Sequence, residues 1–384
     1  SWSLQNEQTM GFSGARVADV LCETDGGEKL LFLKVVEPSP LPATATAEAK
    51  RKWDRNLQSY ANEVMFLSND AIKEALASRQ VVVPETLGVE AVPGKRYALL
   101  TDNLRQSFTT FAVHPAARTG EVITWLADFH GAFQGRVPSG HSLWEFGTHV
   151  HLERRPPGET DMLPASIASF SKAFEGIDPF FARPEVASLG ERLRNVAPLV
   201  ARHLTPRPQN QNRTTLVHGE ISRAQTTSSG MNASAREGVA AIDWQWTGPG
   251  IGATDMIYLF CGSVEDEIVD NYKYWLAQYH NRLADESYSF DDFYIDFKAA
   301  TLDYARWVFA YRLVGDTPEK FRQRAEKVDA SWHPVSTWAF SAGTPQGYVG
   351  CFSWWRSSSP KQKPDALSAS SDGATGSSLA AVGL

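Results

Sequence analysis

The sequence has few cysteines and no long apolar run, and each absence excludes a class of protein. Three cysteines in 384 residues are odd in number, far apart and without metal-site spacing. Neither a disulfide framework nor a zinc site is therefore expected. This usage predicts the cytoplasm or another reducing compartment, and an organelle reached after leader removal is also compatible with it. No stretch is long and apolar enough to predict a membrane span.

Basic charge is also sparse. The net charge is −7, and lysine and arginine are spread along the chain. The most basic stretch, AEAKRKWDR at 47–55, contains its own acids and fits a solvated helix face better than a nucleic-acid patch. Nucleic acid is therefore not expected as a partner. With 42% apolar and 21% charged residues, the composition is that of a globular protein.

The first hundred residues are rich in expected strands. Apolar and polar residues alternate over 15–23, glycines at 26–27 indicate a turn, and 29–38 completes a predicted hairpin. Residues 45–79 contain few Gly or Pro and predict one long helix or two. Two more strands are expected within 81–102, around the turn PGK.

Beyond residue 102 the pattern is mostly helical. Apolar residues recur at helical spacing in three segments, 120–134, 187–204 and 290–313. Two short apolar runs, 214–218 and 239–244, interrupt this region as expected strands. An acidic residue lies at the end of each run, where a carboxylate can face a site.

These patterns predict an α+β fold with two lobes. We expect a small β-rich, nucleotide-binding lobe over 1–101, a larger helical lobe over 102–345, and a mostly disordered Ser/Ala/Gly-rich tail over 346–384. Acids on short strands at the boundary of two such lobes suggest phosphoryl transfer. That chemistry needs bound phosphates, neutralised charge and a positioned attacking oxygen.

The candidate phosphate-binding residues lie in the first lobe. Lys34 is the one charge within the apolar strand LFLKVV, which is costly unless the charge is paired, and Glu63 on the following helix is the candidate partner. A snorkelling lysine on an edge strand is the alternative. The stretch GFSGA, with Gly11, Ser13 and Gly14, can fold over phosphates, although an ordinary turn explains it equally well.

The candidate base and metal ligands lie around the two short strands. Asp243 follows the run VAAI, and Mg²⁺ prefers such carboxylate oxygens together with nucleotide phosphates. Gln225 offers a neutral oxygen, and Glu220 would face the attacking hydroxyl. The alternative for each acid is a cap on the turn that follows its strand.

The run LVHGEISRAQ, followed by VAAIDWQWTGPGIGATDMIYLF, resembles the core of the aminoglycoside phosphotransferase and choline kinase superfamily. The closest likeness is to its ecdysteroid kinase-like (CHK kinase-like) branch. KVVEP, YANEVMFL and YALLTDNL resemble that family's lysine strand, paired-glutamate helix and hinge, and the resemblance extends over about residues 10–330. The matching positions in the core are His218, Gly219, Asp243, Trp244, Gln245 and Asp255.

The resemblance implies a protein-kinase-like fold and an ATP- and Mg²⁺-dependent phosphotransferase. Its partner would be a small-molecule alcohol, either sterol-, choline- or aminoglycoside-like. Asp255 is expected to be structural, at a helix start where it braces the catalytic turn. The implied site residues are Glu220, Asp243 and His218 for catalysis, Lys34, Glu63, Gly11, Ser13, Gly14 and Asp102 for the nucleotide, and Gln225 and Asp243 for the metal.

Aromatic residues are frequent in the expected helical lobe, at 291–297, 304–312 and 351–356. An aromatic wall there would bind a cation or a flat lipid. A helical core explains most of these residues equally well, and it is the favoured interpretation.

Two positions depart from the family pattern, because its catalytic Asp is Glu220 here and its metal-binding Asn is Gln225. Each change adds one methylene. A longer arm moves a carboxylate by about 1 Å, which can cost about a hundredfold in rate. An active kinase is favoured. The alternative is a pseudokinase that serves as a nucleotide-binding or protein-assembly subunit with a protein partner. A metal-dependent hydrolase is less favoured, because no His-rich ligand set is present.

Overall fold

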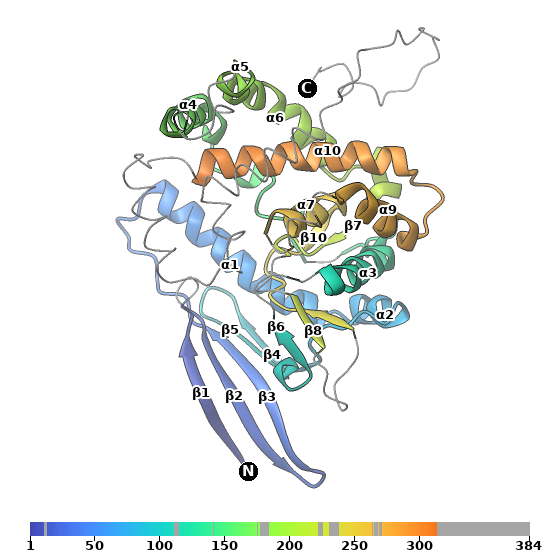
Figure 1. Cartoon of the computed structure of the whole chain (residues 1–384). Coiled ribbons are helices and arrows are strands. Elements are labelled where there is room, and N and C mark those ends of the chain that lie inside the picture. Colours follow the sequence, from blue (N-terminus) through green and yellow to red (C-terminus); the bar gives the residue numbers. More distant parts are fainter. Residues whose placement is uncertain are drawn as a thin grey trace.

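The computed structural model has the α+β architecture expected, with an N-terminal sheet and a mostly helical C-terminal part (Figure 1). The expected tail over 346–384 lies outside the described residues. The structure describes residues 1–10, 14–110, 114, 116–140, 142–174, 176, 184–221, 226–229, 238–262, 264, 268 and 271–312.

A five-stranded antiparallel sheet forms the N-terminal part, in the order β1-β2-β3-β5-β4. The two predicted hairpins, β2–β3 and β4–β5, are confirmed. The first strand was not predicted, because all of its residues are exposed and no alternation marks it. The ends of β1, β2 and β3 extend away from the rest of the molecule (Figure 1). The strands are β1 (Trp2–Thr9), β2 (Arg16–Thr24), β3 (Gly27–Val36), β4 (Thr86–Val92) and β5 (Arg96–Asp102).

Two helices, α1 (Ala47–Ser68) and α2 (Asp70–Ser78), connect β3 to β4. The hydroxyl of Thr46 accepts a hydrogen bond from the N–H of Ala49 and caps α1. Asn69 has an extended backbone, which ends α1, and its side chain caps α2. This one residue explains why residues 45–79, predicted as one long helix or two, form two.

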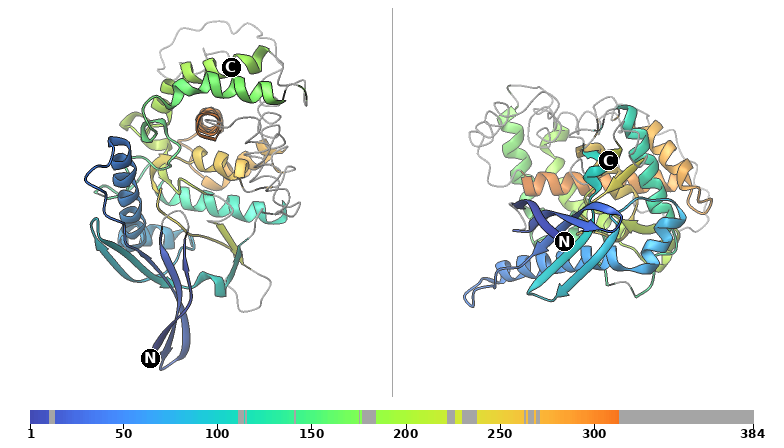
Figure 2. Two further views of the ribbon diagram at one scale, coloured as in Figure 1. Left: turned by 90° about the vertical axis from the view of Figure 1, so that its left-hand side faces the viewer. Right: turned by 90° about the horizontal axis from the view of Figure 1, so that it is seen from below.

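Helices dominate the C-terminal part and lie in layers. In the left view of Figure 2, α10 is seen end-on between α4 and α6 on one side and α7 and α3 on the other. The expected helices at 120–134, 187–204 and 290–313 correspond to α3, α6 and α10, the last followed by a π-helical turn over Val308–Arg312. The helices are α3 (Ala116–Phe133), α4 (Leu163–Phe174), α5 (Pro184–Ala187), α6 (Leu189–Leu204), α7 (Ala253–Gly262), α9 (Tyr272–Leu283) and α10 (Phe290–Trp307).

Two small sheets accompany these helices, and both contact α3. In one, β7 (Thr214–Val217) pairs antiparallel with β10 (Gly248–Ile251). In the other, the order is β6 (Phe108–Thr110), β8 (Thr226–Ser229) and β9 (Val239–Ala241). The expected strands at 214–218 and 239–244 are therefore present as β7 and β9, with shorter bounds.

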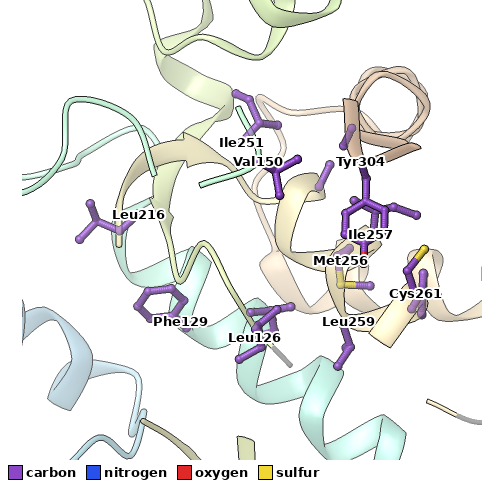
Figure 3. Packing of buried hydrophobic residues seen from close by; sticks show 14 of the residues in the cluster. Leu126, Phe129, Val150, Leu216, Ile251, Met256, Ile257, Leu259, Cys261 and Tyr304 are labelled. Carbon is purple, nitrogen blue, oxygen red and sulfur yellow. The ribbon is translucent and has the colours of Figure 1, made fainter. Parts of the chain in front are cut away.

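The apolar core holds β7 against the helices. Leu126 and Phe129 of α3, Leu216 of β7, and Met256 and Leu259 of α7 pack together and are completely buried (Figure 3). The burial of these apolar side chains fixes the end of β7 and the start of α7 relative to each other. The end of β7 leads into the candidate catalytic turn, and the start of α7 carries the acid that braces this turn.

Most of the described aromatic residues of α10 belong to this core. Phe293 and Phe297 are buried, and Phe293 stacks on Tyr279 with ring centroids 5.0 Å apart. This agrees with the favoured interpretation of segment 291–297. In the described residues, no helix is both long and apolar enough to cross a membrane.

Candidate active site

A buried lysine on β3 joins two carboxylates from distant parts of the chain. Lys34 Nζ lies 2.6 Å from Oε2 of Glu63 on α1 and 3.9 Å from Oδ1 of Asp243. Burial alone would lower the pKa of Lys34, but these two negative charges outweigh burial and hold the pKa above its usual value. Lys34 is thus a paired cation and not a snorkelling one.

Asp243 has an unusual backbone and an oxygen without a hydrogen-bond partner. Its φ of 68° is left-handed, a conformation that costs about 1–3 kcal/mol for a non-glycine residue and is frequent at functional sites. Among the described residues, Oδ1 is buried and accepts no hydrogen bond. Such an oxygen suits a hard cation such as Mg²⁺. The described part of the chain contains no cluster of three His, Cys, Asp or Glu residues arranged for a metal.

The imidazole of His218 connects the backbone at Glu220 to the backbone just before Asp243. Its Nε2 lies 3.0 Å from the carbonyl oxygen of Ile242, and its Nδ1 accepts a hydrogen bond from the N–H of Glu220 at 3.4 Å. These partners assign the proton to Nε2. Burial lowers the pKa of His218 despite the attraction of Asp255, so the ring is neutral near pH 7. One ring therefore connects the backbone of Glu220 to the residue before Asp243.

Asp255, in the first turn of α7, holds the turn that follows β7. It is almost completely buried, and its carboxylate accepts hydrogen bonds from the N–H groups of His218, at 2.6 Å, and Gly219, at 2.9 Å. The same carboxylate lies 3.1 Å from Nε2 of His130, whose Nδ1 lies 2.7 Å from the hydroxyl of Tyr279. The expected bracing role of Asp255 is thus present as two backbone hydrogen bonds.

Gly219 allows the turn to approach its neighbours closely. Its φ is 86°, and a Cβ atom there would collide with the carbonyl oxygen of Trp246 and the backbone nitrogen of Thr148. We expect Gly219→Ala to lower the free energy of unfolding by about 3 kcal/mol, because backbone atoms cannot give way as a flexible side chain does. Chemical denaturation measures this loss.

Gly140→Ala is the matched control for that substitution. Gly140 also has a left-handed backbone, with φ 72°, but open space surrounds the position of its Cβ. We expect a cost of about 1 kcal/mol there, from backbone conformation alone. Equal losses at the two glycines would contradict the collision at Gly219.

The other predicted nucleotide residues are only partly described. Asp102 ends β5, opposite Leu31 of β3, and its Oδ1 accepts a hydrogen bond from the N–H of Glu85 at 2.7 Å. Its side chain therefore holds the chain that enters β4. Gly14 has φ 64° in the connection between β1 and β2. Three predicted site residues lie outside the described residues, namely Gly11, Ser13 and Gln225.

A cluster of aromatic rings next to the candidate catalytic turn was not predicted as a unit. The ring of His149 lies 5.4 Å from Trp246, 5.9 Å from Tyr258 and 5.1 Å from Trp307, and Tyr258 lies 5.3 Å from Tyr304. His149, Trp246 and Tyr258 are only partly buried. The rings come from four separate segments. The sequence offered Tyr304 and Trp307, within the aromatic segment 304–312, and Trp246, in the motif DWQW, but nothing in it showed that these rings meet His149 and Tyr258.

The comparison with models of known protein families agrees with the resemblance. The profile of the ecdysteroid kinase-like family matches residues 41–290, well over half of the chain. No curated protein sequence matches significantly. Among similar solved structures, a GDP complex of wild-type aminoglycoside 2'-phosphotransferase-IIIa is 12% identical over 92% of this chain and 94% of that chain, with a TM-score of 0.43. A microcompartment-associated aminopropanol kinase is 15% identical over 93% of this chain and 92% of that chain, with a TM-score of 0.44. A choline kinase from Streptococcus pneumoniae is 12% identical over 86% of this chain and 95% of that chain, with a TM-score of 0.41.

Proposed function

Because the chain belongs to the ecdysteroid kinase-like family, we propose that it transfers a phosphoryl group from ATP to a hydroxyl group of a small molecule. The observation that carries this proposal is the convergence of Lys34, Glu63 and Asp243 beside the turn that bears Glu220. The nucleotide would lie between the N-terminal lobe, residues 1–101, and the helical lobe, residues 102–345.

Lys34 would bind the nucleotide phosphates. Its pairing with Glu63 keeps the ammonium group charged in a largely buried position. Asp243 and Gln225 would hold Mg²⁺, which neutralises phosphate charge when bound. The buried oxygen of Asp243, which has no hydrogen-bond partner among the described residues, supports this assignment.

Glu220 would orient the acceptor hydroxyl and accept its proton. His218 is better suited to positioning than to catalysis, because it is buried and its two ring nitrogens are engaged by Ile242 and Glu220. The neutral ring can then hold both backbone segments without competing for the proton.

The acceptor would lie against the partly buried rings of the aromatic cluster, those of His149, Trp246 and Tyr258, which Tyr304 and Trp307 support from the core. Ring faces bind flat apolar molecules and cations. The close approach of Gly219 to Trp246 brings this cluster next to the catalytic turn. A sterol-like or choline-like alcohol suits these rings better than an aminoglycoside, whose polar groups need hydrogen-bond partners.

Thermal unfolding with ATP and Mg²⁺, separately and together, tests the proposal. We expect the two together to raise the melting temperature most, since ligand at one hundred times its Kd stabilises the folded state by about 2.7 kcal/mol. Lys34→Met should abolish the shift. Lys73→Met is the control, because Lys73 is exposed on α2 and pairs only with Asp70 among the described contacts. No shift in any condition would contradict every nucleotide-binding function.

The departures at Glu220 and Gln225 support a second candidate, a pseudokinase that binds nucleotide as an assembly subunit. The same samples distinguish the two functions when they are incubated with labelled ATP and a panel of alcohols. Phosphate on an alcohol supports the kinase. A thermal shift without transfer to any sterol, choline-like or sugar alcohol supports the pseudokinase.

A further inference from the structure

Asn62 is a completely buried polar residue on α1, and each hydrogen bond of its side chain leads to the C-terminal part. Its Nδ2 donates to the carbonyl oxygens of Trp244 and Thr247, both at 2.9 Å. Its Oδ1 accepts from the N–H of Trp144 at 2.8 Å. An asparagine amide has two N–H donors, and backbone groups use both of them here.

These hydrogen bonds lie next to the candidate nucleotide site. Glu63 follows Asn62 on α1 and binds Lys34, whereas Trp244 follows Asp243, which lies 3.9 Å from Lys34. A rotation of α1 would therefore move Glu63 and Lys34 relative to Asp243. The bond from Asn62 to Trp244 resists that rotation.

The same side chain is connected to the catalytic turn. Thr247, whose carbonyl accepts from Asn62, donates through its hydroxyl to the carbonyl oxygen of His218 at 3.3 Å. The indole Nε1 of Trp144 donates to the carbonyl oxygen of Gln245 at 2.7 Å. Asn62 thus lies at the junction of α1, the turn 244–247 and the segment at 144.

Apolar packing alone would not fix this arrangement. Phe66, one turn further along α1, stacks on Trp244 with ring centroids 4.2 Å apart. Stacked rings can slide over each other at little cost, whereas hydrogen bonds weaken steeply when their angles change. The directional contacts of Asn62 therefore specify the rotation of α1, and the stacking adds buried area.

We propose that Asn62 is a positioning residue that sets the rotation of α1 against the turn 244–247, so that Glu63 holds Lys34 beside Asp243. The expected effect of Asn62 on nucleotide affinity rests on the proposed function. The expected effect of Asn62 on the reactivity of Lys34 does not, because all the contacts concerned lie within the protein.

Two variants and one control test the proposal. Asn62→Ala removes every hydrogen bond of the side chain, and Asn62→Leu removes them as well but fills nearly the same space and adds no charge beside Lys34. Asn210→Ala is the matched control, because Asn210 is also buried, donates to the carbonyl oxygen of Thr205 at 3.0 Å and accepts from the N–H of Arg207 at 2.7 Å. Asn210 belongs to no part of the proposed site.

The first measurement is the acylation rate of Lys34 by an amine-reactive ester, followed by mass spectrometry without nucleotide. A lysine that is released from Glu63 loses the attraction of that negative charge, so its pKa falls. A pKa that is lower by one unit gives about ten times more neutral amine. We expect both Asn62 variants to label about tenfold faster, and Asn210→Ala to label at the wild-type rate. If Asn62→Ala does not fold, Asn62→Leu, which leaves a smaller cavity, decides the result.

The second measurement is the Kd of ATP with Mg²⁺ by calorimetry, at a temperature where all variants are folded. We expect about tenfold weaker binding in the Asn62 variants only, equivalent to about 1.4 kcal/mol. If the wild type binds no nucleotide, the proposed function fails and the labelling rate alone decides the role of Asn62. The inference would be overturned if the Asn62 variants lost as much stability as Asn210→Ala but their Lys34 were labelled at the wild-type rate.

Discussion

Asp255→Asn is expected to lower the free energy of unfolding by about 4 kcal/mol and phosphoryl transfer by about a hundredfold. The carboxylate accepts from two buried N–H groups, those of His218 and Gly219, and lies in hydrogen-bond distance of His130. An amide keeps one acceptor oxygen but turns an NH₂ group toward a donor. A buried N–H group then loses its partner, and the catalytic turn loses its attachment to α7. Chemical denaturation and the transfer rate per folded molecule measure the two effects.

Asp296→Asn separates a local effect on the turn from a general loss of stability. Asp296 is also completely buried, and its carboxylate is bound by His203, Arg213 and Tyr288. We expect a comparable loss of stability there, but an unchanged transfer rate per folded molecule. A wild-type rate in Asp255→Asn would show that the turn does not depend on its brace.

The pairing of Lys34 with Glu63 could be predicted because one charge in an apolar strand requires a partner. The pattern of apolar residues also predicted both hairpins and the helices α3, α6 and α10. The first strand gave no such signal, because every residue of Trp2–Thr9 is exposed. Hydrophobic periodicity arises because one face of an element is buried. A fully exposed edge strand has no buried face and therefore shows no such periodicity.

Asn62 could not be identified from sequence for a different reason. Its partners are backbone groups at 144, 244 and 247, and a backbone carbonyl is the same whichever side chain it carries. Only the three-dimensional arrangement makes this asparagine different from an exposed one. The aromatic cluster has the same property, since its rings meet only after distant segments have packed.

Glu220→Asp is expected to raise the rate of phosphoryl transfer by about tenfold to a hundredfold, because a shift of about 1 Å at a catalytic group has effects of this size. The family pattern that the chain resembles has aspartate at this position. Glu220→Gln is the companion variant, since it keeps the length and removes the base. It should lower the rate by about 10²–10⁴-fold. Initial rates with the best alcohol of the panel measure both.

The surroundings of Glu220 explain why the backbone cannot compensate for its longer arm. The N–H of Glu220 is directed at Nδ1 of His218, and the preceding N–H groups are held by Asp255. Gly219 lies against backbone atoms that leave no room for a Cβ. Because these contacts hold the chain up to the backbone nitrogen of Glu220, we expect the extra methylene to displace the carboxylate. A rate that falls in Glu220→Asp would show that the acceptor is bound at the distance that glutamate reaches, and that the site is matched to the longer side chain.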